Sequence, residues 1–312
     1  MKHGNASMQP RLIITVDTEL SNFPRAQGLW GRIGTEEWGV PKLLAVFDAL
    51  AIHGTFFLDA YAGNAADLAE QRRAAELIAG GGHDLQLHTH PGPAFDPRRD
   101  QLLDYSLEEQ QEILELGAQR LQEWSGKRPV LHRAGDWAAD HRSLEALRGC
   151  GFRADFSAMP WGSACGYSPA AIRGNGWTRI EGMLCGVGTC YQDRLTGRMR
   201  RVDLGGVSFL EAADVLASGV DPLFLTLHSF SLLRHDRSRS HFAAFPEYIE
   251  LLGRFCRLAR EKWNYRTSSA LEAVIDLQAE PAAPLPWSAL PTTRALSSGV
   301  GILKSVRERL RA

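Results

Sequence analysis

Short apolar runs alternate with amphipathic helical segments along most of this chain, and this alternation restricts its fold more than any other feature. The first apolar runs are RLIITV at residues 11–16, TFFLDA at 55–60 and HDLQLH at 83–88. Segments with helical periodicity follow the first two, at residues 41–54 and 67–82. Strands that alternate with helices in this way indicate a parallel sheet covered by helices.

The alternation continues through the rest of the chain. Further strands are predicted at residues 128–133, 152–157, 222–230 and 264–269. Capping boxes at Ser106 and Glu109 and at Ser269 and Glu272 indicate helix starts, and Pro246 opens another helix. About seven strand–helix units in 312 residues fit a closed or nearly closed barrel as well as an open doubly wound sheet.

Charge and composition exclude several classes of protein. The formal net charge is −1, so no basic field points to nucleic acid. No apolar run approaches the ~20 residues that a membrane-spanning helix needs, and LIITV is too short for the core of a signal peptide. The five cysteines form no C-x-x-C pair, which favours reduced thiols and a cytoplasmic protein.

Two regions depart from the strand–helix pattern. Residues 158–207 are rich in glycine and weakly periodic, which predicts an irregular insertion or a small hairpin inside a domain of residues 1–278. Residues 279–312 begin as a Pro/Ala-rich linker and end as a basic amphipathic tail, GILKSVRERLRA. This tail is either a frayed surface helix or a peripheral contact with a partner or an anionic membrane.

Ionisable residues gather at the ends of the predicted strands. In parallel α/β folds the active site lies at the carboxyl ends of the strands, so these side chains should meet on one rim. They are Asp17, Glu19, His88, His90, Arg133, Asp155 and His228, with Asp136 and Trp137 just beyond Arg133.

His88 and His90 predict a metal site. Residues i and i+2 of a strand point to the same side, so the two rings can address one point. Catalytic zinc sites use three protein ligands and a water molecule, and Glu19 or Asp17 would supply the third ligand. A divalent metal is therefore expected, with zinc as the first candidate and Co, Mn, Ni or Fe as alternatives.

A metal at this rim predicts hydrolysis. A bound metal lowers the pKa of water and polarises a carbonyl group. Asp17 suits the general base, Arg133 would keep it ionised, and His228 suits the acid that protonates the leaving amine. Arg133 could equally form a structural salt bridge. Asp155 would either orient His228 or cap the next loop.

Three residues are candidates for contacts with the substrate. Asp136 lies next to the predicted rim, and Trp137 and Trp161 could form a wall that stacks against a sugar. Packing in the core would explain either tryptophan equally well.

These segments resemble the polysaccharide deacetylases, the carbohydrate esterase family-four group. The likeness rests on TVDTE, GHDLQLHTHP, HRAGDW, RADFS and LTLHSFS, in that order, over roughly residues 11–275. The resemblance implies a distorted (β/α)₇ barrel, a divalent metal and removal of acetyl groups from a sugar.

The motifs differ from the usual family pattern at three places. Thr18 follows Asp17 where the family usually has a second aspartate, so Glu19 or Asp17 itself would be the ligand. Only Thr89 separates two histidines that usually stand four apart, and Ser229 follows His228 where aspartate is common. These changes resemble a divergent subgroup tied to bacterial surface-polysaccharide assembly.

Three functions follow as hypotheses. The first is a metal-dependent deacetylase that acts on an N-acetylated amino sugar in a polysaccharide, a glycolipid or a nucleotide sugar. The second is an amidohydrolase or deformylase that acts on a non-sugar amide with the same metal and residues. The third is a barrel that binds glycans without turnover.

Overall fold

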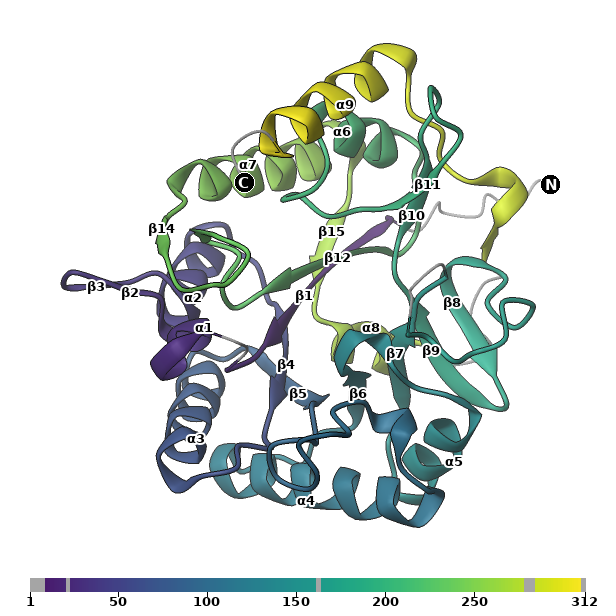
Figure 1. Ribbon diagram of the computed structural model, residues 1–312. Helices are drawn as coiled ribbons and strands as arrows, with labels where there is room; N and C mark the ends of the chain where they lie inside the picture. Colours follow the sequence, from purple (N-terminus) through teal and green to yellow (C-terminus); the bar gives the residue numbers. More distant parts are fainter. Residues whose placement is uncertain (1–8, 21–22, 161–163, 278–283, 310–312) are drawn as a thin grey trace.

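A curled parallel sheet forms the centre of the structure (Figure 1). The computed structural model describes residues 9–20, 23–160, 164–277 and 284–309. Over these residues the main sheet has ten strands in the order β12, β1, β4, β5, β6, β7, β9, β8 and β16, with β15 paired to β1. The predicted fold class is confirmed, since the sheet and its helices form a distorted half-barrel of the (β/α)₇ type.

Seven neighbouring strands of this sheet are parallel. They are β12 (Leu223–His228), β1 (Arg11–Thr18), β4 (Thr55–Asp59), β5 (Asp84–Thr89), β6 (Leu131–Ala134), β7 (Ala154–Ala158) and β9 (Met183–Val187). The next strands, β8 (Gly174–Ile180) and β16 (Leu285–Pro286), are antiparallel to their neighbours.

The seventh parallel position is held by β9, which lies in the glycine-rich region. The strand predicted at residues 264–269 is the short β15 (Arg266–Ser268), which pairs only with the start of β1. The two ends of the curled sheet approach each other, because Trp177 of β8 packs edge to face on Phe224 of β12 with ring centroids 5.2 Å apart.

Of the two alternatives predicted for residues 158–207, an irregular insertion or a small hairpin, the central part forms hairpins, and the irregular alternative is wrong there. This part forms β8 and β9, and a hairpin of β10 (Cys190–Gln192) and β11 (Met199–Arg201) follows. Glycine weakens a strand pattern in the sequence, but here it permits close packing. A Cβ atom on Gly186 would lie 2.7 Å from the ring of Phe156.

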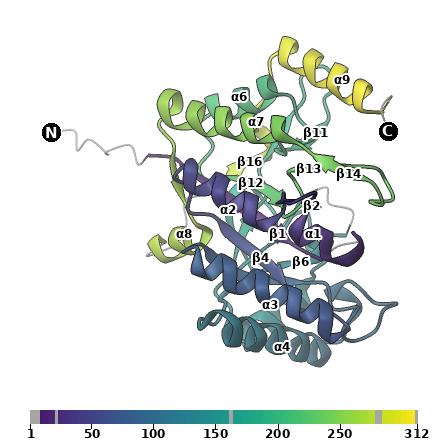
Figure 2. The same cartoon turned by 90° about the vertical axis from the view of Figure 1, so that its left-hand side faces the viewer.

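Helices cover the outer face of the sheet. They are α2 (Val40–Ala49), α3 (Ala65–Gly80), α4 (Leu107–Ser125), α5 (His141–Gly149), α6 (Phe209–Ala217) and α7 (Pro246–Arg257). Figure 2 shows α7, α2, α3 and α4 arranged as one layer. Buried apolar side chains of these helices meet those of the strands in two large clusters, which hold the strand ends in fixed positions.

The predicted helix signals are confirmed at three helices. Ser106 and Glu109 form a capping box at the start of α4, and Pro246 is the first residue of α7. Ser269 caps α8 (Ala270–Asp276). The sequence pattern places the end of α2 too late, because the helix stops at Ala49. Gly54 instead leaves room for the ring of Phe47, which a Cβ atom at that position would overlap.

The amino end of the barrel is closed. Ala270 and Ala273 of α8 pack with Ile13 and Phe57 in the interior cluster of buried side chains. The backbone N–H of Ala270 donates a hydrogen bond to Thr55 at the start of β4. Access to the strand ends is therefore confined to the carboxyl side, where the predicted site residues lie.

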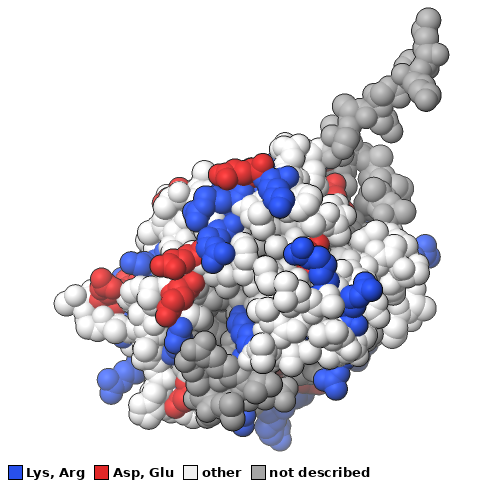
Figure 3. Space-filling model, turned by 90° about the horizontal axis from the view of Figure 1, so that it is seen from above, with Lys and Arg blue, Asp and Glu red and all other residues white. Residues whose placement is uncertain are grey.

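The C-terminal segment returns to the domain. The helix α9 (Ala295–Arg309) packs on α6, and Lys304 donates hydrogen bonds to the carbonyl groups of Leu204, Gly205 and Val207. The face seen in Figure 3 mixes Lys and Arg with Asp and Glu. Within the described ranges, none of the helices combines the length and apolar character needed to cross a membrane. The division of the chain at residue 278 remains a prediction.

Candidate metal centre and active site

Strand register brings the predicted residues together at the carboxyl rim. Asp17 of β1 stands opposite His228 of β12, and Asp59 of β4 stands opposite His88 of β5. Thr18 pairs with Leu58 in the β1–β4 register, so the next residue on each side, Glu19 and Asp59, come together. Side chains from four adjacent strands therefore converge on one point.

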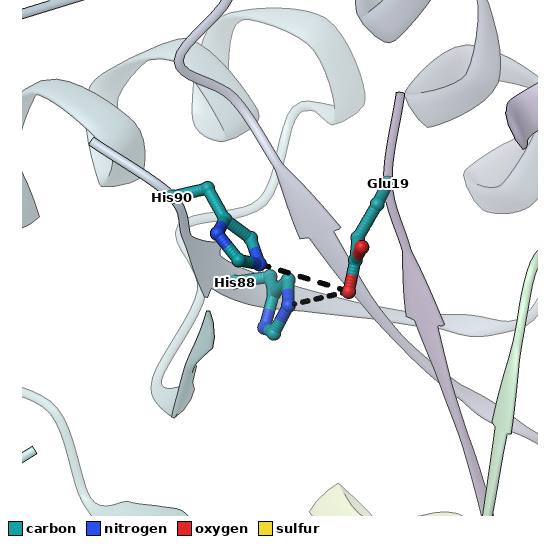
Figure 4. Close-up of side chains that lie close together, drawn as sticks. All are labelled: Glu19, His88 and His90. Carbon is teal, nitrogen blue, oxygen red and sulfur yellow. Dashed lines mark hydrogen bonds and ion pairs between the residues drawn. The ribbon is translucent and has the colours of Figure 1, made fainter. Parts of the chain in front are cut away.

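Glu19, His88 and His90 form the candidate metal centre (Figure 4). Their ligand atoms all lie within 4.8 Å of one another. Glu19 Oε1 is 3.1 Å from Nε2 of His88 and 3.7 Å from Nε2 of His90. A carboxylate oxygen and two imidazole nitrogens aimed at one point are a donor set that suits a divalent transition metal. The arrangement therefore fits the metal expected from the sequence.

Each histidine is oriented through its other ring nitrogen. Nδ1 of His88 lies 2.9 Å from the carbonyl oxygen of Arg133, and Nδ1 of His90 lies 2.9 Å from Oδ2 of Asp100. A carbonyl oxygen can only accept, so Nδ1 of His88 is the donor and Nε2 keeps the lone pair in the neutral ring. Metal-binding histidines typically have such partners. Asp100 lies in a loop with no periodic pattern, and the sequence offered no signal for it.

The carboxylates and imidazoles in this group stabilise one another's charged forms. Burial alone would raise the pKa of Glu19, but its interactions with the rings of His88 and His90 outweigh burial and hold that pKa well below its usual range. Burial would lower the pKa of His90, but hydrogen bonds to Asp100 and Glu19 outweigh it and hold that pKa well above its usual range. Glu19 is thus ionised and ready to bind a cation.

Asp17 is held by Arg133. Arg133 Nη1 donates to Asp17 Oδ1 at 2.5 Å and Nη2 donates to Thr15 Oγ1 at 2.9 Å, and both charged side chains are buried. Burial would raise the pKa of Asp17, but the Arg133 guanidinium, with His88 and His228, lowers it below its usual value. Asp17 also belongs to a second group with Glu19 and His228, within 4.8 Å. Because a guanidinium already neutralises Asp17, we place the cation at Glu19.

His228 ends β12, which lies on one side of β1 in the sheet, whereas the strand of the two histidines, β5, lies on the other side. Glu19, which follows β1, is therefore between them. The backbone N–H of His228 donates to Ser231, and the His228 ring lies 4.9 Å from the ring of Phe230. Within the described part of the chain, the imidazole itself takes part in no hydrogen bond. The ring is only partly buried and lines the cavity, so it is available to a bound substrate.

The structure does not bring Asp155 to His228. Asp155 is fully buried, and its carboxylate accepts hydrogen bonds from Ser157 and from Tyr167 at 2.8 Å. Its Oδ1 also lies 2.8 Å from Nδ1 of His132, whose Nε2 reaches Thr89 at 3.2 Å. The prediction that Asp155 orients His228 is therefore wrong. Phe156 of β7 packs on Phe224 of β12 inside the barrel, and Asp155, the preceding residue, points to the opposite face of the sheet.

We expect Asp155→Ala to reduce the free energy of unfolding by about 3–5 kcal/mol, because it leaves several buried donors without an acceptor. Thermal and urea unfolding would measure this loss, with Asp155→Asn as the milder control. Folded Asp155→Ala should keep its metal affinity. A variant with wild-type stability and no activity would contradict this structural role.

A cavity of about 600 Å³ opens over the candidate metal centre. Its lining includes Glu19, Asp59, His90, Asp100, Asp136 and His228. Asp136 thus lies where a substrate contact was predicted. Trp137 does not line this cavity; the guanidinium of Arg201 covers its ring at 4.3 Å. Trp161 lies outside the described residues.

Asp59 is a cavity residue that none of the sequence motifs marked. It is the last residue of β4, and its place at the carboxyl end of the strand TFFLD is the feature of the sequence that could have marked it as a candidate site residue. It is buried, and burial raises its pKa to about 6.

Comparisons with known proteins bear on the family and the fold. Residues 33–154 match the family model described as polysaccharide deacetylase. None of the curated proteins compared with the chain matches it. Among solved structures, a Mycobacterium smegmatis protein provisionally assigned as a polysaccharide deacetylase is 16% identical with a TM-score of 0.53, and the alignment covers 88% of this chain and 93% of that one.

Two more distant structures are similar as well. The chitin deacetylase of Colletotrichum lindemuthianum is 13% identical with a TM-score of 0.48, over 85% of this chain and 88% of its own. A carbohydrate esterase family-four pseudoenzyme of Bacillus anthracis is 12% identical with a TM-score of 0.47, over 86% and 66%. The family resemblance stated from the sequence is confirmed, whereas the subgroup remains a prediction.

Proposed function

We propose that this chain, whose residues 33–154 match the family model described as polysaccharide deacetylase, is a metal-dependent hydrolase that removes an N-acetyl group from an amino sugar. One observation carries the proposal: Glu19 Oε1 faces Nε2 of both His88 and His90, while the neighbouring carboxylate, Asp17, is held by Arg133. The two carboxylates of the TVDTE strand therefore have different surroundings, as a metal ligand and a base require.

Glu19, His88 and His90 would hold the metal. A divalent metal in such a site lowers the pKa of a water molecule and polarises an acyl oxygen. Asp17 keeps a low pKa beside Arg133, so it is ionised and can accept a proton at Oδ2 while Oδ1 stays with the guanidinium. His228, on the far side of the centre, would donate a proton to the leaving nitrogen.

The experiment that tests this function is a substrate screen. Purified protein, with metal content measured, would be incubated with N-acetylated amino sugars in free, nucleotide-linked and lipid-linked form, and acetate release followed. Acetate release that depends on added metal supports the proposal. Formate release from N-formyl sugars or amides, without acetate release, would favour the deformylase alternative, and the absence of any turnover would favour a glycan-binding barrel.

The finer features of the substrate and of the location are also proposals. All five cysteines are free, which supports a reducing compartment and hence a cytoplasmic substrate such as a nucleotide sugar or a lipid-linked intermediate. Leu296 and Leu303 of α9 are exposed beside basic residues, which supports a peripheral contact of the C-terminal segment. Vesicle sedimentation of the whole protein would test that contact.

Metal affinity should fall as the pH falls. His90 binds a metal only in its neutral form, and in the metal-free protein its pKa is held well above the usual range. Below that pKa the metal must displace a proton, so we expect the apparent affinity to drop about tenfold per pH unit. Calorimetry in buffers of different ionisation enthalpy would count the released protons. Asp100→Asn removes the anionic partner of His90 and should shift the fall in metal affinity to lower pH. A metal affinity that does not change with pH would contradict the assignment of His90 as a ligand.

A further inference from the structure

A second pocket, of about 220 Å³, lies on the carboxyl rim of the sheet beside the cavity over the candidate metal centre. That main cavity is built at the ends of β12, β1, β4 and β5, whereas the rim pocket is built at the ends of the next strands, β6, β7 and β9. Trp137 follows β6, Met159 follows β7 and Cys190 follows β9. Strand order therefore makes the main cavity and the rim pocket neighbours.

The turn Gly135–Trp137 joins the two. Asp136 lines the main cavity and Trp137, the next residue, lines the rim pocket. Both have positive φ angles, 52° for Asp136 and 56° for Trp137. Such angles are uncommon outside glycine and persist where the surrounding structure enforces them, often at binding sites. Gly135 is packed against the candidate ligand His90, since a Cβ atom on it would lie 2.3 Å from the ring.

The rim pocket differs in charge from the main cavity. Acidic residues predominate around the main cavity: Glu19, Asp59, Asp67, Asp100 and Asp136. None of the described residues that line the rim pocket is acidic, and two of them, Arg200 and Arg201, are basic. The guanidinium of Arg200 is already paired with Glu211 at 2.6 Å and donates to the carbonyl group of Gly206. Arg201 is therefore the stronger candidate for a contact with a ligand.

Arg201 brings unused hydrogen-bond donors to the rim pocket. It stands opposite Cys190 in the β10–β11 hairpin, and its guanidinium lies over the ring of Trp137 at 4.3 Å. Among the residues that the structure describes, no group accepts a hydrogen bond from this side chain, and its ion pair with Asp203 is long, at 3.8 Å. A guanidinium carries five N–H donors in a planar fork, which matches the oxygens of a carboxylate or a phosphate group.

We propose that the rim pocket is a second subsite, in which Arg201 binds an anionic group of the substrate, a carboxylate or a phosphate. The ring of Trp137 supports the guanidinium and fixes its plane. This inference rests on the proposed function, because it places a second part of the same substrate. It narrows the substrate class to an acidic glycan or a phosphorylated sugar, with the anionic group next to the N-acetylated sugar.

Binding of three probes to the full-length protein, with its metal removed so that no probe is consumed, tests the subsite by calorimetry. A hyaluronan tetrasaccharide carries carboxylates beside N-acetylglucosamine, UDP-N-acetylglucosamine carries phosphates, and tetra-N-acetylchitotetraose is neutral. We expect one anionic probe to bind about tenfold or more tighter than the neutral one, and its identity distinguishes carboxylate from phosphate. Arg201→Gln should weaken that probe by about tenfold to 100-fold, as expected for hydrogen bonds to a charged group, and leave the neutral probe unchanged.

Arg198→Gln is the matched control, because Arg198 lies in the turn of the same hairpin, is exposed and does not line the rim pocket. Its affinities for the three probes should equal those of wild type. If Arg201→Gln is not recovered folded, Arg201→Met gives the same comparison. A wild type that binds the three probes equally or binds none, or an Arg201 variant that keeps the anionic preference, would overturn the subsite. A preference that depends on Arg201, without acetate release from any amino sugar, would instead overturn the proposed function.

Discussion

His88→Ala and His90→Ala should each remove most of the bound metal, and with it the hydrolytic activity. Wild type should hold about one equivalent of divalent metal. Each substitution deletes one imidazole of the set that faces Glu19, so each should leave only a small fraction of that equivalent bound after gel filtration. Metal analysis by mass spectrometry measures this directly.

The matched control is His53→Ala. His53 is half-exposed and pairs with Glu272 at the opposite end of the barrel, so its loss should leave the metal content unchanged. The His88→Ala and His90→Ala variants should both remain folded, because each substitution removes only one Nδ1 hydrogen bond, to Arg133 O or to Asp100 Oδ2. If only one of the two variants loses metal, the other histidine is structural and the proposed geometry fails.

Asp17→Asn should abolish turnover while the metal stays bound. Loss of a positioned general base typically costs about 10²- to 10⁴-fold in rate. Asp17 contacts Arg133 rather than the histidine pair, so its conversion to an amide should not release the cation. Initial rates on the substrate found by the screen, together with metal content, measure both effects.

Glu19→Gln provides the opposite pattern on the same strand. This substitution removes the negative charge next to His88 and His90, so we expect the variant to lose its metal. Its activity should fall because the metal is lost. Asp17→Asn also leaves the buried Arg133 without its anionic partner, which should cost about 3–5 kcal/mol in stability, so the assays should be run well below the melting temperature of the variant. A loss of metal in Asp17→Asn and its retention in Glu19→Gln would exchange the two roles.

Much of the fold was predictable because its signals are local. A buried strand shows as a short apolar run and an amphipathic helix as a periodic one, and Ser106, Ser269 and Pro246 cap or open their helices through neighbours three or fewer residues away. The glycine-rich strands β8 and β9 carry no such signal. Their stability comes from Phe156 and other side chains distant in sequence, which no local pattern records.

Within the site, the sequence by itself determined which residues stand at the strand ends and that His88 and His90 share a side. Both follow from the two-residue period of an extended chain. Only the tertiary structure decided which carboxylate faces the histidines, that Asp155 pairs with His132, that Asp100 contacts His90, and that Asp59 lines the same cavity. Strand order, register and loop paths set those contacts, and they depend on the packing of residues far apart in the chain.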